Sequence, residues 1–207
     1  GAKKIDGART NFAQVSAAQK VWPNAKIQIC FWHLKKAIKK RLTDNTYPKV
    51  INYSSYSAHQ VFEFIDIEFY PTPPSQMTPV QKKSFCFCPK ELRPKILDMI
   101  VQHMHFHSLI PNTSGVYLTA YEIWKQSTKQ VYEFCTYHDL KLLWIYLWEH
   151  WYREELWVLW SHSAYDKICL FRTTMLCESH WKVIKQDFLP KFFRPRLDLL
   201  TYMGALQ

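Results

Sequence analysis

The sequence predicts an α/β protein in which helices dominate. Near the N-terminus, Lys26 to Phe31 alternates apolar and polar residues as a strand does, between two segments with helical spacing. From Pro89 onwards, apolar residues recur at intervals of three and four, as on one face of a helix. Hydrophobic residues make up 48% of the chain and charged residues 21%, which is the balance of a globular protein with a core.

The first part, residues 1–42, is expected to form a helix, a strand and a second helix. The first helix covers Asn11 to Trp22, with Asn11 as its cap and Pro23 as its end. The strand follows at Lys26 to Phe31, and the second helix runs from Trp32 to Leu42. The apolar side of that helix comprises Leu34, Ala37, Ile38 and Leu42, and its basic side comprises Lys35, Lys36, Lys39, Lys40 and Arg41.

The second part, residues 43–169, starts with loops and continues with helices. Prolines interrupt residues 43–90, and Pro71 to Ser84 is expected to be an exposed linker. Within that stretch, His59 to Phe69 permits either a strand or a short helix. Helical spacing then covers Glu91 to His107 and Thr119 to Thr136. The second of these begins with a capping box, Thr119 and Glu122, and an aromatic helical segment follows at Leu140 to Trp160.

The third part, residues 170–207, is expected to contain a long helix and a shorter one. The long helix runs from Thr174 to Phe188 and stops before Pro190. The shorter one covers Arg194 to Met203.

Positive charge is distributed unevenly along the chain. The net charge is +10, and residues 1–42 carry ten lysines and arginines against one acid, a local excess of +9. Residues 43–169 carry a net −2, and residues 170–207 a net +3. Concentrated positive charge is typical of a surface that meets a polyanion such as DNA. A surface that merely keeps the protein soluble is the alternative.

Several classes of protein are excluded by pattern. There is no glycine-rich phosphate loop and no apolar run long enough to cross a membrane, so no membrane partner is expected. The N-terminus lacks the apolar core of a signal peptide, and the six cysteines form no dense framework. We therefore expect reduced thiols in an intracellular protein.

Two separated stretches, Trp22 to His33 and Arg172 to Trp181, resemble the second half of the catalytic domain of Mutator-like element (MULE) DNA transposases of the fungal type. The resemblance extends from about Asn11 to Met203. It implies a partial RNase H-like α/β fold with a large, mostly helical insertion, truncated because the family's first strands would precede residue 1. It also implies that the protein is encoded by a transposable element and takes part in DNA recombination in the nucleus.

The resemblance implies a metal-dependent site that is incomplete in this chain. Such transposases hold two divalent ions, Mg²⁺ or Mn²⁺, with two Asp and one Glu. Glu178 matches the Glu, whereas Arg9 stands where the second Asp is expected, and its positive charge would repel a metal ion. Asp6 lies three residues early and is a candidate replacement, and the first Asp would lie upstream. Whether the chain is an enzyme stays open.

The candidate DNA-binding residues lie in the predicted helix Trp32–Leu42 and in the two predicted C-terminal helices. They are Lys35, Lys36, Lys39, Lys40, Arg41, Lys182, Lys185, Arg194 and Arg196.

Three further groups have a functional and a structural interpretation. Cys30 and His33 form a Cys-x-x-His pair that is either a zinc half-site or core packing. A second zinc site is conceivable from Cys86 and Cys88 with three histidines, namely His103, His105 and His107. The tryptophans Trp144, Trp148 and Trp151 either stack on bases or pack in the core.

The sequence therefore predicts a transposase-derived DNA-binding protein with a degenerate catalytic site. One alternative is an active metal-dependent transposase or nuclease, completed by a missing N-terminal region or by a second subunit. Another is a domesticated interaction module whose basic faces bind an acidic protein.

Overall fold

The computed structural model describes residues 20, 28–48, 51–73, 75–168 and 182–183. The chain divides into two compact units, residues 1–169 and 170–207. In the second unit the description covers Lys182 and Val183, which are helical and exposed. All elements named below belong to the first unit.

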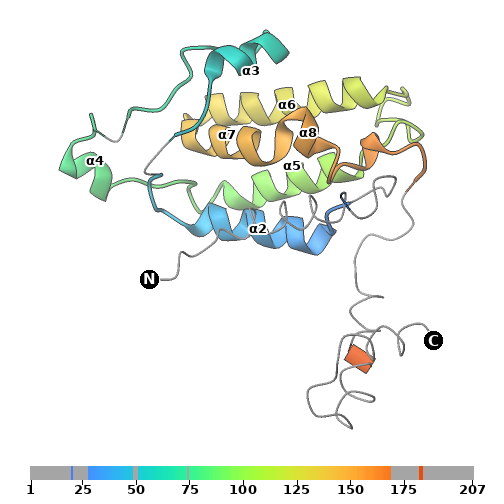
Figure 1. Cartoon of the computed structure of the whole chain (residues 1–207), viewed down its shortest axis with the longest axis horizontal. Helices are drawn as coiled ribbons and strands as arrows, with labels where there is room; N and C mark the ends of the chain where they lie inside the picture. Colours follow the sequence, from blue (N-terminus) through green and yellow to red (C-terminus); the bar gives the residue numbers. More distant parts are fainter. Residues whose placement is uncertain (1–19, 21–27, 49–50, 74, 169–181, 184–207) are drawn as a thin grey trace. The chain divides into compact units, whose positions relative to one another are not determined.

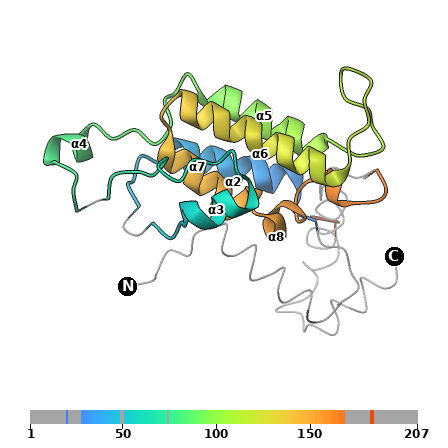
Figure 2. The ribbon, with the colours of Figure 1, turned by 90° about the horizontal axis from the view of Figure 1, so that it is seen from above.

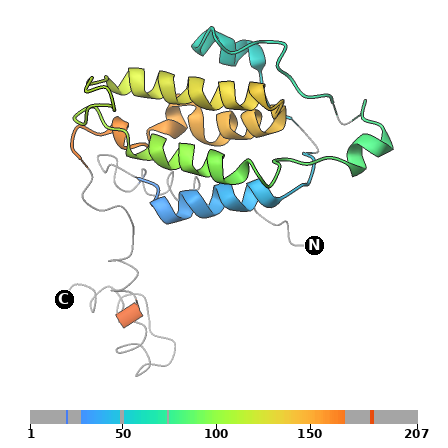
Figure 3. The ribbon, with the colours of Figure 1, turned by 180° about the vertical axis from the view of Figure 1, so that it is seen from behind.

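The body of the first unit is a bundle of helices α2 (Phe31–Thr43), α5 (Arg93–His105), α6 (Ala120–Tyr137) and α7 (Lys141–Leu147). Helix α2 packs on α5, α5 on α6, and α6 on α7. Successive helices of this series run in opposite directions (Figures 1 and 3). Seen from above, α5 and α6 lie next to each other along their length (Figure 2).

The predicted α/β class is wrong for the part of the chain that the structure describes. Those residues include no strand, and no RNase H-like sheet is present among them. Residues 28–30, from the predicted strand, form no strand or sheet pairing, and Phe31 already begins α2. Ile29 is buried and donates one backbone hydrogen bond to the Leu159 carbonyl, at 2.7 Å. Its apolar character therefore reflects packing of a helix entry segment, which short alternation cannot distinguish from a strand.

Three of the helices predicted from apolar spacing are confirmed. The predicted Trp32–Leu42 is α2, Glu91–His107 is α5, and Thr119–Thr136 is α6. The predicted helices at Asn11–Trp22, Thr174–Phe188 and Arg194–Met203 lie outside the described residues, apart from Lys20, Lys182 and Val183. The capping box of α6 also forms, since the Thr119 hydroxyl accepts from the Glu122 amide at 3.2 Å and the Glu122 carboxylate accepts from the Thr119 amide at 2.8 Å. These reciprocal bonds satisfy two amide groups that the first turn of a helix leaves without partners.

The aromatic segment Leu140–Trp160 is helical at first and then changes form. Helix α7 passes into a five-residue π-helix, η1 (Trp148–Tyr152), followed by α8 (Glu154–Trp157). A short 3₁₀ turn, η2 (His162–Ala164), comes next. The Arg153 amide donates to the Trp148 carbonyl at 3.2 Å. This pairing of two residues five apart in sequence is the hydrogen bond that defines a π turn.

Indole rings form much of the core, which confirms the structural interpretation of the tryptophan run. Trp144, Trp148 and Trp151 are all buried. Buried indole N–H groups usually find an acceptor, and several here do. Trp144 donates to the Tyr53 hydroxyl at 2.9 Å, and Trp160 donates to the Trp151 carbonyl at 2.7 Å. Base stacking by this run is therefore ruled out in the folded unit.

The loop-rich region contains two short helices. Helix α3 (Ser55–Val61) ends within the segment His59–Phe69, and the rest of that segment forms turns. Neither the strand nor the short helix considered for that segment describes it, because Phe62, Ile65 and Phe69 are buried from turns rather than from one regular face. Helix α4 (Pro79–Lys83) lies in the predicted linker, most of whose described residues are exposed.

Candidate nucleic-acid interface

Helix α2 has an apolar face that fixes its orientation. Leu34, Ile38 and Leu42 are at most 1% exposed and belong to the core, on the side that packs against α5. Their spacing of four residues places them in one row along the helix. Because this row is buried, the opposite side of α2 faces outwards.

Four lysines occupy that outward side. Lys35, Lys36, Lys39 and Lys40 are all exposed. With 3.6 residues per turn they cover an arc of roughly 140° in two rows, each of residues four apart. None of the described carboxylates forms an ion pair with them. We call these four residues the α2 lysine face.

An exposed tryptophan lies within the α2 lysine face. Trp32 is 52% exposed, which is unusual in a chain whose described tryptophans are otherwise buried. The Lys36 ammonium lies 4.4 Å from the centre of its ring, and the His33 ring meets it edge-on at 5.0 Å. The cation–π contact holds Lys36 along the helix surface. Sequence reasoning missed Trp32, although a lone tryptophan four residues before a lysine in a basic helix was a usable signal.

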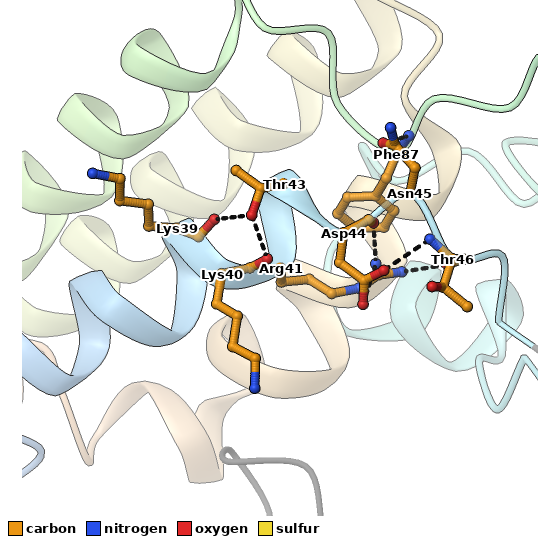
Figure 4. A network of polar contacts seen from close by, with 8 residues as sticks. All are labelled: Lys39, Lys40, Arg41, Thr43, Asp44, Asn45, Thr46 and Phe87. Atoms are coloured by element: carbon orange, nitrogen blue, oxygen red, sulfur yellow. Dashed lines mark hydrogen bonds and ion pairs between the residues drawn. The ribbon is translucent and has the colours of Figure 1, made fainter. Parts of the chain in front are cut away.

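Arg41, the fifth basic residue predicted for this helix, is engaged within the protein. Its guanidinium lies 3.6 Å from the centre of the Phe87 ring and donates to the Asp44 carbonyl at 2.7 Å. Asp44 in turn accepts from the Thr46 amide, and this hydrogen bonding lowers the pKa of the Asp44 carboxyl (Figure 4). The network closes the C-terminal end of α2, where a cation also suits the helix dipole. Arg41 therefore holds the helix end, whereas the lysines project from it.

The other sequence-predicted DNA-binding residues belong to the second unit. Lys182 is exposed and belongs to the second unit. Lys185, Arg194 and Arg196 lie outside the described residues, as do the carboxylate candidates Glu178 and Asp6. Arg9 and most of the two stretches that carry the transposase resemblance also lie outside them.

The candidate zinc ligands do not assemble into a site among the described residues. There, no three His, Cys, Asp or Glu side chains lie together as a metal would need. His33 is exposed beside Trp32, and Cys30 is half-buried one residue before α2. Burial raises the pKa of the Cys88 thiol to about 11, which opposes the thiolate that zinc binds. A zinc role for these cysteines stays a prediction.

The histidines of α5 have structural surroundings. His103 is fully buried between the Tyr152 hydroxyl and the Gln130 side-chain oxygen, each at 2.7 Å. Since the amide oxygen can only accept, His103 Nε2 carries the proton and Nδ1 accepts from Tyr152. Burial lowers the pKa of His103 to about 4, so the ring is neutral near pH 7. His107 is also buried, and its Nδ1 accepts from the Leu109 amide.

Comparisons of the chain with protein-family models, with curated proteins and with solved structures gave no match. No helix in the described part of the chain is long and apolar enough to cross a membrane.

Proposed function

We propose that the chain binds DNA through the α2 lysine face. The observation that carries this proposal is the group of four exposed lysines, none in an ion pair with a described carboxylate, on a helix whose other side is anchored in the core. Because the helix backbone that carries these ammonium groups is already ordered, binding to phosphates incurs no cost for ordering it. The 13 residues of α2 span about 20 Å, enough to follow several phosphates of a duplex.

The chemistry of this face supports binding that is largely independent of DNA sequence. Lysine is a point charge suited to phosphate, whereas bidentate base recognition is the usual work of Arg, Asn and Gln. Arg41, the one arginine of α2, stacks on Phe87. Trp32 adds an exposed ring that can stack on an unpaired base at a DNA end or gap.

The transposase resemblance favours DNA over other polyanions. Trp22 to His33 leads directly into α2, and residues 1–42 together hold an excess of +9. A transposase-derived protein of this kind would act in the nucleus. Cleavage would need two more carboxylates and Mg²⁺ or Mn²⁺ besides Glu178, supplied by a further segment or a partner subunit, and Arg9 is unsuited to that role. DNA binding with a degenerate catalytic site is therefore our proposal.

A matched pair of variants tests the role of α2. Lys36→Gln with Lys40→Gln removes two exposed charges, four residues apart, from α2. The control, Lys125→Gln with Lys129→Gln, removes two exposed lysines with the same spacing from α6. Fluorescence anisotropy with a short labelled duplex should show binding by the wild type and the control, and about tenfold weaker binding by the α2 variant at low salt. Equal affinities for both variants would contradict the proposal.

Competition separates DNA from an acidic protein partner. The wild-type chain bound to labelled duplex is challenged with unlabelled duplex and with polyglutamate at equal charge concentration. We expect the duplex to displace the label at lower concentration. Preferential displacement by polyglutamate would instead support the interaction-module alternative, in which the same lysines bind an acidic protein.

A further inference from the structure

A cleft lies on a different part of the first unit from the α2 lysine face. It encloses about 710 Å³ between the segment that precedes α3, helix α3 itself, and the run from η1 into α8, with Trp124 of α6 in its wall. None of its lining residues belongs to α2. Cavities of this size take small organic ligands or one large side chain with its neighbours.

The apolar wall of the cleft consists of two tryptophans held in fixed positions. Trp124 donates from its indole nitrogen to the Tyr152 carbonyl at 2.7 Å and packs edge-on against Phe62, with ring centres 4.7 Å apart. Trp148 packs against the same phenyl ring, at 6.3 Å. Because both indoles are anchored, this wall is formed before any ligand arrives.

The polar wall carries an excess of negative charge. Glu149, Glu154 and Glu155 line the cleft together with one cation, Arg153. Arg153 bridges two of these carboxylates, at 3.1 Å to Glu149 and in a closer contact to Glu155. Glu154 is exposed and forms no ion pair with the described residues. The lining therefore holds a net charge of −2 around a cation that is already paired.

Glu149 lies in an environment that favours a cationic partner. Burial raises the pKa of its carboxyl, against the opposing effect of Arg153. A partly desolvated carboxylate gains more from a second positive charge than a fully hydrated one does. Serine hydroxyls at Ser54 and Ser57 stand on the α3 side of the cleft and can accept further hydrogen bonds from an N–H donor.

The backbone at this wall has an unusual form. Glu149 and Trp148 both belong to the π-helix η1, and single π turns inside helices occur often at functional sites. The π turn places an anchored indole and a half-buried carboxylate next to each other in the lining of the same cavity. If α7 continued as a regular α-helix, this π turn would be absent from the cleft wall.

We propose that this cleft binds an organic cation, an ammonium or guanidinium group carried on an apolar stem. The stem lies against the cleft wall that Trp124 and Trp148 contribute to, and the charged group pairs with Glu149. Anions are disfavoured by the three carboxylates. The cation comes either from a free amine or from a Lys or Arg side chain of a peptide.

Isothermal titration of the full chain with matched probes tests the cleft. Phenethylamine carries an ammonium on an apolar stem, 2-phenylethanol is its neutral counterpart, and acetyl-Ala-Lys-Ala-amide presents the same charge on a peptide. We expect a cation to bind at least about tenfold more tightly than the alcohol, because a hydrogen bond to a charged group contributes that much. Binding of phenethylamine alone identifies a small-molecule site, and binding of the peptide as well identifies a side-chain site.

Two variants and their controls connect that binding to the cleft. Glu149→Gln should weaken cation binding at least about tenfold, whereas Glu133→Gln, an exposed position on α6 outside the cleft, should not change it. Val61→Lys places an ammonium at the exposed rim and should also weaken binding, while Val61→Gln should not. This second pair applies even if the Glu149 variant fails to fold.

Three results would overturn the proposal. They are equal affinity for the amine and the alcohol, no binding of any cation, and unchanged binding in Val61→Lys. Loss of DNA binding in the α2 variants leaves the cleft unaffected, so the two proposals fail separately.

Discussion

Neighbouring basic residues of one helix have different roles in this protein. Lys40 is exposed, whereas Arg41 is half-buried with its guanidinium on Phe87 and its donors on the carbonyls that follow α2. Sequence alone treats both as phosphate ligands, because the stacking partner lies 46 positions away. At the scale of the residue, the planar guanidinium suits a fixed structural contact and the flexible ammonium suits a mobile polyanion.

Buried His103 makes the stability of the fold depend on pH. Its pKa is lowered to about 4 in the folded chain, chiefly by burial, against about 6.5 when unfolded. The unfolded chain therefore takes up a proton first as the pH falls, and stability is lost between about pH 6.5 and 4. The loss attributable to this residue should be roughly 3 kcal/mol over that window, with no further contribution from it above pH 7.

Urea unfolding of the wild type and of His103→Gln, each from pH 7.5 to pH 4, measures this effect. Carboxylates contribute equally to both proteins, so the difference between the two curves isolates the histidine. The wild type should lose stability more steeply, and NMR should show the His103 ring still neutral at pH 5. Parallel curves, or a ring that takes up its proton near pH 6.5, would contradict the buried neutral ring.

At the scale of the element, apolar spacing predicted the helices well wherever one face is buried. In α2 and α5 the residues at intervals of three and four are those that enter the core, such as Ile38 and Ile96. The strand prediction failed at Gln28 to Cys30 because three alternating residues also fit an extended approach to a helix. The π-helix η1 leaves no such signal, since it depends on how several large rings pack together.

The capping box of α6 yields a direct stability prediction. Thr119→Ala removes the hydroxyl that accepts from the Glu122 amide and should lower the free energy of unfolding by about 1 kcal/mol. Thr136→Ala is the control in the same helix, because its hydroxyl bonds only to the Glu133 carbonyl within the helix. Chemical denaturation should show a change within about 0.5 kcal/mol for that control. Equal losses at both positions would show that the cap has no special effect.

At the scale of the whole molecule, the two candidate sites differ in how far sequence could reveal them. The α2 lysine face is contiguous, so helical periodicity and charge counting were sufficient to predict its residues. The cleft combines residues near 51–61 with Trp124 and residues 148–155, which nothing local in the sequence connects. Its carboxylates lie in residues 43–169, whose net charge is close to neutral, so charge counting did not reveal them either.

The fold class, too, could not be predicted from local sequence features. A family resemblance carried by Trp22 to His33 and Arg172 to Trp181 led to an α/β prediction, but most of those residues lie outside the described part. The described residues between them form a helical bundle with an indole-rich core. Helix α2 belongs to that bundle, and its lysines are presented by packing on α5.

The salt dependence of DNA binding tests the central claim most directly. The logarithm of the association constant for a B-form duplex is measured against the logarithm of salt concentration, for the wild type and for the variant with Lys35, Lys36, Lys39 and Lys40 all changed to Gln. Each phosphate contact contributes about 0.9 to the slope, so the variant should have a slope shallower by about 3 to 4. The same slope for both proteins would show that DNA is held elsewhere, and would contradict binding through α2.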